Sequence, residues 1–171
     1  MKALIKFFKE QDDSSLNEHK LPYVYTEKGV WAGADPEAIT LFFSQLPLTK
    51  FKNFIDLGCG DGRVTILAAQ TIQSVGIESD MNLIGKAHKA IKQFKSTAEV
   101  KMGDFFDLDL SRFDLIFINP DKGFNYGLEK KLVDELKGTL VVYNNLFLPR
   151  FLTQGETFVC KNIPFTIYTN E

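Results

Sequence analysis

The chain has 171 residues, of which 44% are hydrophobic and 25% are charged. This is the length of about one domain and the composition of an ordinary globular protein, which excludes disordered, collagen-like and disulfide-framework chains. Twenty Lys and Arg residues against 22 Asp and Glu residues give a net charge of −2, so the chain lacks the basic excess of a sequence-independent nucleic-acid binder.

The N-terminal part is expected to contain two helices separated by a polar and an irregular stretch. Residues 2–10 can form a short amphipathic helix, and the polar residues 11–20 are expected to be a loop. Residues 21–34 contain glycine and proline breaks and are expected to be irregular. Asp35 followed by proline is the pattern of an N-cap with proline at the first helical position, which predicts a helix over 36–46.

From residue 51 onward, short apolar strands alternate with helical patterns. Asp80 is expected to cap a helix whose apolar residues recur at helical spacing as far as Phe94. Gly138 is a plausible stop for the helix that precedes it. The predicted strands are 51–57, 74–77, 98–102, 113–118 and 140–143, and the predicted helices are 64–72, 81–94 and 128–136. This alternation is typical of a parallel sheet with helices on both faces.

The last part of the chain breaks this alternation. Residues 156–160 and 165–169 are expected to be two strands of an antiparallel hairpin, with Asn-Ile-Pro between them. The predicted fold is therefore α/β, a Rossmann-like three-layer sandwich with a mostly parallel seven-stranded sheet and an antiparallel C-terminal hairpin. We expect one domain, with a helix and lid segment over 1–50 and a cofactor-binding core over 51–171.

The few cysteines and histidines give no sign of a metal site. Cys59 and Cys160 lie about a hundred positions apart, and with His19 and His88 they form no zinc-binding spacing. The N-terminus is interrupted by lysine, and no apolar run approaches the roughly 18 residues of a membrane span. We therefore expect a cytoplasmic, reduced protein without a metal or a membrane contact, and a monomer.

A glycine-rich loop follows the first strand of the core. It has the spacing G-x-G-x-G at Gly58, Gly60 and Gly62, and Asp56 precedes it in the strand. The loop lies where a strand turns into a helix, which is where open α/β sheets place their ligands. Glycines let the backbone turn tightly and approach a ligand closely. Cys59 has no base near it in the sequence and is expected to be a small residue of this loop.

An acid at the end of the next strand suggests a ribose-containing ligand. Glu78 lies twenty residues after Gly58, where a carboxylate can accept hydrogen bonds from both ribose hydroxyls. A dinucleotide motif would have its third glycine at Arg63, and a pyrophosphate would be repelled by Asp56 and Asp61. A ligand with an amine and a sulfonium, such as S-adenosylmethionine, is favoured instead. A nicotinamide-dependent oxidoreductase and a non-catalytic cofactor-binding module stay as alternatives.

In these residues the chain resembles the class I, seven-β-strand S-adenosylmethionine-dependent methyltransferases, by motif over roughly residues 51–145. The glycine loop resembles their first motif and Glu78 their ribose-binding acid. Gly103-Asp104-Phe105 resembles the third motif, in which the acid bonds the adenine amino group and the next residue covers the ring. The resemblance implies S-adenosyl-L-methionine as cofactor, and the cofactor-binding residues that it implies are Asp56, Gly58, Cys59, Gly60, Glu78, Asp104, Phe105 and Asn119.

Asn119-Pro120-Asp121 lies at the family's catalytic motif, after the fourth strand of the core. It resembles in part the Asn/Asp-Pro-Pro-Tyr/Phe motif of the N6-adenine and amide methyltransferases, whose stacking aromatic residue is replaced here by Lys122. This partial match leaves a nucleic-acid base or a small molecule open as the methyl acceptor.

The pattern is closer to the small archaeal and mitochondrial-type protein lysine methyltransferases. Tyr23-Val24-Tyr25-Thr26 is similar to their Tyr-Val-Pro-Thr stretch, with tyrosine in place of proline. The resemblance implies methylation of a protein lysine, with Asn119 and Asp121 facing the acceptor and Tyr25 closing the site. An anionic Asp121 also suits a lysine ammonium better than a nucleobase. Trp31 is either a core anchor or a lid of the pocket.

Overall fold

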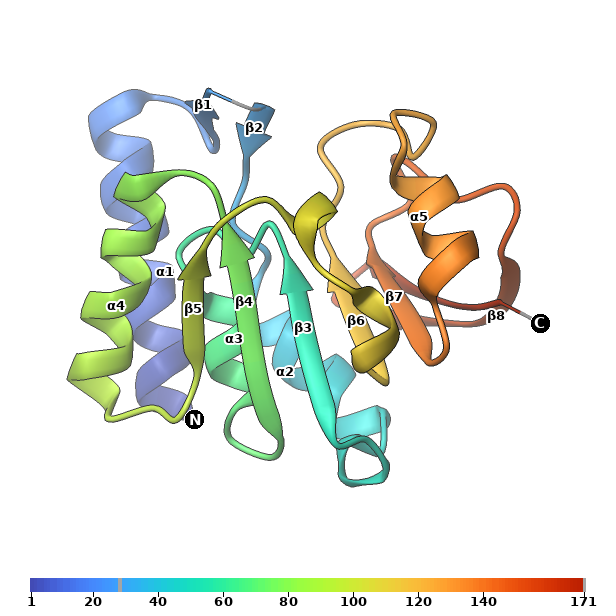
Figure 1. Ribbon diagram of the computed structural model, residues 1–171. Coiled ribbons are helices and arrows are strands. Elements are labelled where there is room, and N and C mark those ends of the chain that lie inside the picture. Colours follow the sequence, from blue (N-terminus) through green and yellow to red (C-terminus); the bar gives the residue numbers. More distant parts are fainter. Residues whose placement is uncertain (28, 171) are drawn as a thin grey trace.

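A seven-stranded sheet with the strand order β5-β4-β3-β6-β7-β9-β8 forms the centre of the structure (Figure 1). The computed structural model describes residues 1–27 and 29–170. The five strands from β5 to β7 are parallel, whereas β9 runs antiparallel to both β7 and β8. This confirms the predicted Rossmann-like sheet with its antiparallel C-terminal hairpin.

The strands lie close to their predicted positions because each carries a run of buried apolar residues. All four residues of β6 are buried, as expected for a parallel strand covered on both faces. The strands of the sheet are β3 (Asn53–Leu57), β4 (Gln73–Glu78), β5 (Glu99–Met102), β6 (Leu115–Ile118), β7 (Thr139–Tyr143), β8 (Thr153–Cys160) and β9 (Ile163–Thr169). The hairpin turns at Lys161 and Asn162, one position earlier than predicted, because Pro164 already pairs with Val159.

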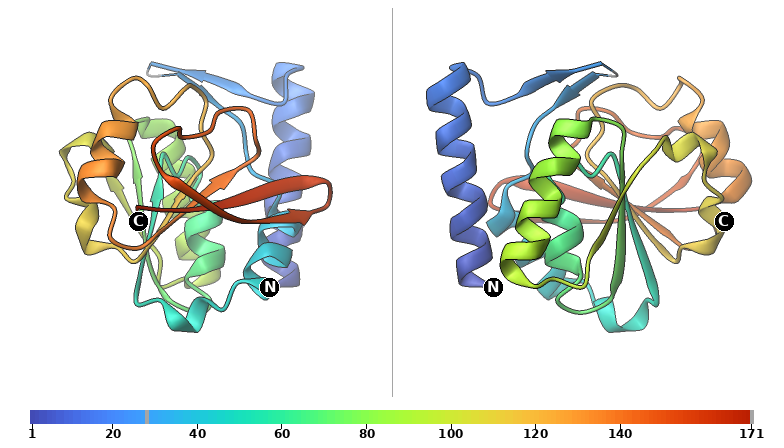
Figure 2. Two further views of the ribbon diagram at one scale, coloured as in Figure 1. Left: turned by 90° about the vertical axis from the view of Figure 1, so that its right-hand side faces the viewer. Right: turned by 60° about the vertical axis from the view of Figure 1, so that its left-hand side comes forward.

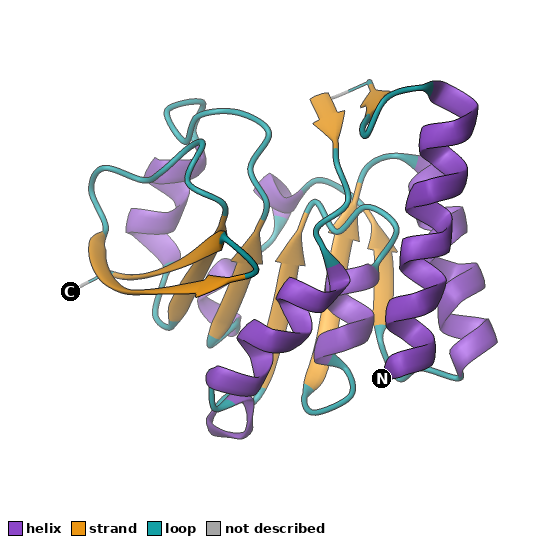
Figure 3. Ribbon diagram, turned by 180° about the vertical axis from the view of Figure 1, so that it is seen from behind, coloured by secondary structure: helices purple, strands orange, loops and turns teal. Residues whose placement is uncertain are grey.

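Helices cover both faces of the sheet. On one face α1, α2 and α3 pack on a core that includes Phe54 and Phe117, and Figure 3 shows these helices in front of the strands. On the other face α5 packs on Ile55 and Ile116. The helices are α1 (Lys2–His19), α2 (Pro36–Gln45), α3 (Arg63–Ala68), α4 (Met81–Phe94) and α5 (Leu128–Glu135), and the single-turn 3₁₀ helices are η1 (Leu48–Lys50), η2 (Phe105–Asp107) and η3 (Leu110–Arg112). None of the described helices combines the length and the apolar character that a membrane span requires.

Two helix starts confirm the predicted caps. The Asp35 carboxylate accepts from the backbone N–H groups of Glu37 and Ala38, with proline at the first helical position of α2. The Asp80 carboxylate does the same for Asn82 and Leu83 at the start of α4. The ends are less regular, and α3 stops at Ala68, several residues before the predicted end at 72.

The N-terminal segment differs most from its prediction. The loop predicted over 11–20 is wrong, since α1 runs from Lys2 to His19 as one helix. Leu4 and Phe8 are buried on one face of this helix. Asp12 lies on the same face one turn after Phe8, and its carboxylate pairs with the buried Arg63. The outer face of this half of the helix is polar and solvated, and that polarity is why the sequence pattern indicated a loop.

The stretch predicted as irregular, 21–34, also contains regular structure. The strands β1 (Val24–Thr26) and β2 (Gly29–Trp31) form a separate antiparallel pair, with Tyr25 opposite Val30. Figure 2 shows this pair reaching from the end of α1 across the upper edge of the sheet. We call residues 24–27 and 29–34 the strap.

Candidate active site

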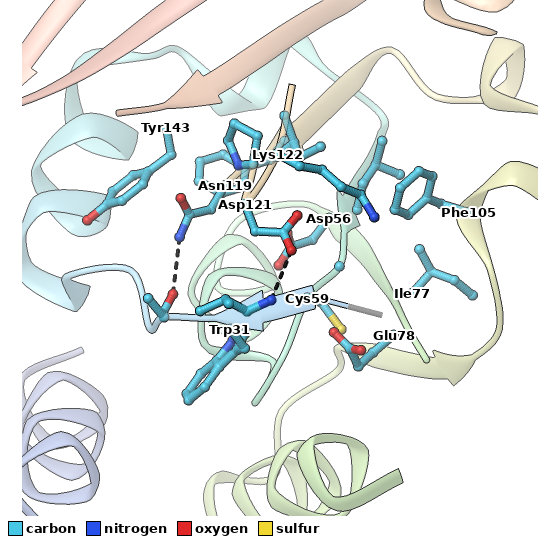
Figure 4. Close-up of a pocket in the computed structure, with 18 of the residues that line it drawn as sticks. Trp31, Asp56, Cys59, Ile77, Glu78, Phe105, Asn119, Asp121, Lys122 and Tyr143 are labelled. Atoms are coloured by element: carbon cyan, nitrogen blue, oxygen red, sulfur yellow. Dashed lines mark hydrogen bonds between the residues drawn. The ribbon is translucent and has the colours of Figure 1, made fainter. Parts of the chain in front are cut away.

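A cavity of about 610 Å³ opens at the carboxyl ends of the central parallel strands. Its walls come from the strap, the glycine loop after β3, the ends of β4 and β5, and the loops after β6 and β7 (Figure 4). The chain moves outward from β3 in both directions, to β4 on one side and to β6 on the other. Open α/β sheets bind their ligands at this switch point.

Glu78 holds the glycine loop at the cavity floor. Its Oε2 atom accepts from the Gly60 N–H at 2.9 Å, and its Oε1 atom accepts from the N–H groups of Ser79 at 2.7 Å and Asp80 at 2.9 Å. The side chain is buried yet lines the cavity. A carboxylate has about four lone-pair sites, so it retains capacity for hydroxyl groups of a ligand.

Asp56 lies at the end of β3, buried at the base of the cavity. Its pKa is raised to about 7, mainly by burial; the hydrogen bond from the Thr65 hydroxyl at 3.0 Å opposes the shift, and the nearby carboxylates Glu78 and Asp61 add to it. The same burial and carboxylates raise the pKa of the neighbouring Cys59 thiol, which is therefore no thiolate nucleophile. A site in which a buried acid resists ionisation favours a ligand with a positive charge.

A buried ion-pair network ties the glycine loop to α1. The Arg63 guanidinium is 2% exposed and donates to Asp61 at 2.7 Å, to Asp12 at 2.6 Å and to the Ala34 carbonyl at 3.0 Å. Because Asp61 is 1% exposed, this arginine compensates a carboxylate that has left water. In the sequence, Arg63 was notable only because it stands where a dinucleotide-binding motif would have its third glycine. Its partner Asp12 lay in a segment that was predicted to be a loop.

Trp31 links the strap to the glycine loop. A Cβ atom at Gly60 would lie 1.8 Å from Trp31 Nε1, and Gly60 has a φ of +56°, so both the contact and the backbone conformation require glycine here. The Arg63 guanidinium lies 5.5 Å from the Trp31 ring centroid, within cation–π range. Trp31 lines the cavity, so of its two possible roles the structure favours a wall of the pocket.

The residues of the predicted third motif lie at the far end of the cavity. Asp104 accepts from the Phe106 N–H at 3.0 Å and caps η2, and the Phe105 ring lines the cavity beside Ile77 (Figure 4). The Gly103 N–H donates to the Glu78 carbonyl at 2.9 Å, which joins this motif to the end of β4. Apolar side chains around an acid suit a flat heteroaromatic ring with an exocyclic amine.

Asn119 and Asp121, after β6, both bond to the strap. The Val30 N–H donates to Asp121 Oδ2 at 3.0 Å, and Asn119 Nδ2 donates to the Ala32 carbonyl at 3.1 Å (Figure 4). A Cβ atom at Gly29 would lie 1.9 Å from Asp121 Oδ2, so the glycine permits this close approach. Asn144, which the sequence did not indicate, donates to Asn119 Oδ1 at 2.8 Å and fixes the amide.

Tyr25 lies apart from the other predicted site residues. It is 70% exposed, packs edge-on against Tyr23 with the ring centroids 5.5 Å apart, and does not belong to the cavity wall. Its role in closing the site stays a prediction. Tyr143 does line the cavity, and its hydroxyl accepts from the Asp35 N–H at 3.0 Å. A tyrosine at the end of an apolar strand gives no sequence signal for such a position.

Comparisons with known proteins agree on a methyltransferase domain but differ in what the relatives act on. The methyltransferase domain family matches residues 48–161. The chain is 38% identical over 93 residues to a protein-lysine N-methyltransferase from Saccharolobus islandicus (strain REY15A), a match that covers 51% of this chain and 58% of the relative. It is 28% identical over 152 residues to a carboxy-S-adenosyl-L-methionine synthase from Helicobacter pylori (strain G27), covering 85% of this chain and 58% of the relative. The matches thus span less than two thirds of either curated relative.

Among solved structures, the fold is similar to an RNA methyltransferase from Salinibacter ruber in complex with S-adenosyl-L-homocysteine. The TM-score is 0.67 at 25% identity, over 81% of this chain and 93% of that chain. The family and this neighbour indicate S-adenosyl-L-methionine as the cofactor, as the sequence predicted. The cavity fits it, because Asp56 favours a cation, Glu78 can accept from ribose hydroxyls, and Phe105 offers an apolar face to a base.

Proposed function

The chain belongs to the methyltransferase domain family, and from this membership we propose that it transfers a methyl group from S-adenosyl-L-methionine to the side-chain nitrogen of a lysine in a protein. The 38% identity to a protein-lysine N-methyltransferase over half of the chain supports this acceptor. We further propose that the enzyme acts as a monomer on a protein partner. The net charge of −2 agrees with an acceptor that carries positive charge.

The observation that carries the proposal is the position of Asp121. Its carboxylate is exposed at the cavity mouth, directly after the strand that ends beside the glycine loop. The Val30 N–H occupies one lone-pair site of Oδ2, and the carboxylate has further sites for a donor. A lysine ammonium that enters the cavity is therefore attracted by a fixed negative charge.

The residues of the cavity would then prepare the lysine for transfer. S-adenosylmethionine supplies an electrophilic methyl group on a sulfonium when it is bound. Asp121 attracts and orients the ammonium at the mouth. Past the mouth, walls that include Phe117, Ile118 and Tyr143 disfavour the charged form, so the nitrogen releases its proton toward Asp121 or water and gains a lone pair.

The position after the motif weighs against a nucleic-acid base as acceptor, because Lys122 occupies the place of the stacking aromatic residue. In the adenine branch, the asparagine of the motif bonds the amino group of the base. Here Nδ2 of Asn119 donates to Ala32 and Oδ1 accepts from Asn144, which leaves Oδ1 one further lone pair. The RNA methyltransferase among the structural neighbours keeps this acceptor as the second candidate.

Transfer of labelled methyl from S-adenosylmethionine into a cell extract tests the proposal. One half of each reaction is digested with protease and the other with nuclease, and the Asp56→Ala variant gives the blank. We expect the label to be lost to protease alone and to be recovered as methyllysine after hydrolysis. Label lost only to nuclease would identify a nucleic-acid acceptor and overturn the proposal. Label that survives both digestions and passes a small-pore filter would identify a small-molecule acceptor.

A further inference from the structure

Exposed apolar side chains are concentrated in two loops beside the cavity mouth. These loops, 123–127 after β6 and 144–151 after β7, lie at the same end of the molecule as the strap (Figure 2). Leu146 is 77% exposed, Phe151 78% and Tyr126 70%. We define the apolar patch as these residues with the less exposed Phe147 and Leu148. Contiguous exposed apolar residues mark a surface that binds a partner.

A second hollow, of about 350 Å³, lies between these two loops. It adjoins the main cavity, because Gly123, Tyr126, Leu146 and Phe147 line both. Arg150 lines its outer part. In the described part of the chain, Arg150 is exposed and forms no ion pair, so its charge is available to a partner. A hollow of mixed character, with residues of the apolar patch and the Arg150 cation in its walls, thus continues the path that leads from the cavity.

The loop 144–151 holds this shape through hydrogen bonds of its backbone to two side chains. The carboxylate of Glu129, 6% exposed, accepts from the N–H groups of Arg150 and, at 2.7 Å, of Phe151. At the other end of the loop, the Asn144 side chain accepts from the Leu146 N–H at 2.9 Å. A buried carboxylate is costly unless it is bonded, and here its bonds fix a loop whose apolar side chains face solvent. The exposure of the patch is therefore built into the fold.

We propose that the apolar patch and Arg150 bind the acceptor protein beside its target lysine, and that they select a large apolar residue and an acidic residue at fixed positions relative to that lysine. The inference rests on the proposed function. Asp121 is complementary in charge to the lysine and Arg150 to the acid, and the apolar patch is complementary to the apolar side chain. Because the two hollows share wall residues, one extended peptide can lie along both.

A nucleic acid fits the same surface less well. Asp121 stands at the mouth, where it would repel a phosphate, and the chain has no basic excess.

An oriented peptide library tests the inference. Each peptide has a central lysine and random flanking residues, and the enzyme is supplied with labelled S-adenosylmethionine. We expect the methylated peptides to be enriched in Leu, Ile, Met or Phe at one position and in Asp or Glu at another. The steady-state constants of the most enriched peptide are then measured with three variants.

Two variants change the surface and one is a matched control. Leu146→Ser should raise KM by about tenfold with little change in kcat, because an apolar contact with the bound peptide is lost while Asp121 and the residues of the cofactor half are unchanged. Arg150→Glu should replace the acidic preference by a preference for Lys or Arg. Val159→Ser changes an apolar residue of similar exposure that lines neither hollow, and it should change nothing.

The outcomes separate the two proposals. Lysine peptides that are methylated without positional preference, or variants with unchanged KM and selectivity, would overturn the inference and leave lysine methylation standing. A library that takes up no label, while RNA in the same assay does, would overturn the proposed function and the inference with it. Calorimetric binding of S-adenosylhomocysteine to all variants shows that the cofactor site is intact.

Discussion

The two halves of the cavity are held together by contacts of different range. On the cofactor side, Glu78 bonds to the two residues that follow it and to Gly60, which is 18 positions away. On the acceptor side, Asp121 bonds to a strap residue 91 positions away, and Asn119 to one 87 positions away. The cofactor half is thus a set of local motifs, whereas the acceptor half is assembled from distant parts of the chain.

The two halves also differ in what they bury. The carboxylates of Asp56, Asp61 and Glu78 are all buried, and each has a hydrogen-bonding partner inside the protein. The hydrogen bond between Val30 and Asp121 is exposed, and such bonds contribute little free energy because water competes for them. We therefore expect substitutions in the cofactor half to change stability strongly, and substitutions in the strap to change the kinetics of the site instead.

The largest effect is expected at Arg63. Arg63→Met keeps the volume of the side chain but leaves the Asp61 carboxylate buried without its cation. Breaking a buried pair in this way costs about 3–5 kcal/mol. Urea unfolding should show a loss of this size, whereas Arg112→Met, which removes an exposed arginine from its pair with Asp109, should cost less than about 1 kcal/mol. Equal losses would mean that the network contributes no more than a surface pair.

A pH-dependent effect is expected at Asp56. Because its pKa is raised from 3.8 to about 7, the folded state keeps a proton that the unfolded state has released. The stability gained from this proton is therefore present at low pH and is lost as the pH rises toward about 7. Relative to Asp56→Asn, the free energy of unfolding of the wild type should fall by about 1.4 kcal/mol per pH unit between these values. Parallel curves for the two proteins would contradict the burial of an ionisable group here.

The difference in contact range explains what the sequence could predict. The glycine loop, Glu78 and the Asp104 motif could be placed at strand ends from the sequence, because strand ends are visible as breaks in apolar runs, and all three line the cavity. The order of elements followed from the same alternation. No such signal exists for the strap. Its two strands have only three residues each, and the strap is held in place by hydrogen bonds to residues about 90 positions away.

The N-terminal error has the same cause. Residues 11–20 looked like a loop because most are polar, and the pairing of Asp12 with Arg63, 51 positions away, which ties this part of the helix to the core, cannot be seen in the local pattern. Likewise, Asn144 and Trp31 contribute to the site through partners that only the folded chain brings close.

A smaller effect is expected at Glu78, and it concerns the affinity of the cofactor half for its ligand. In Glu78→Gln, the amide nitrogen cannot accept from a backbone N–H, so one donor is orphaned if the nitrogen takes the place of Oε2 and two are orphaned if it takes the place of Oε1. We expect the affinity for S-adenosylhomocysteine to fall by about tenfold to a hundredfold in calorimetry. Glu99→Gln on β5, which changes an exposed carboxylate, is the matched control. An unchanged affinity in Glu78→Gln would exclude this acid from the cofactor site.

The smallest effect is expected in the strap, and Trp31 reports it directly because it is the only tryptophan of the chain. Asp121→Asn can still accept from the Val30 N–H, whereas Asp121→Ala cannot. The alanine variant should therefore shift the Trp31 emission to longer wavelength and release S-adenosylhomocysteine roughly threefold faster, as the loss of one exposed hydrogen bond allows. The asparagine variant should keep the emission and the release rate of the wild type and lose only the attraction for lysine, which appears as a raised KM for the acceptor.

If the alanine variant keeps the wild-type emission and release rate, the strap is closed by Trp31 and Asn119 alone, and Asp121 serves the acceptor only.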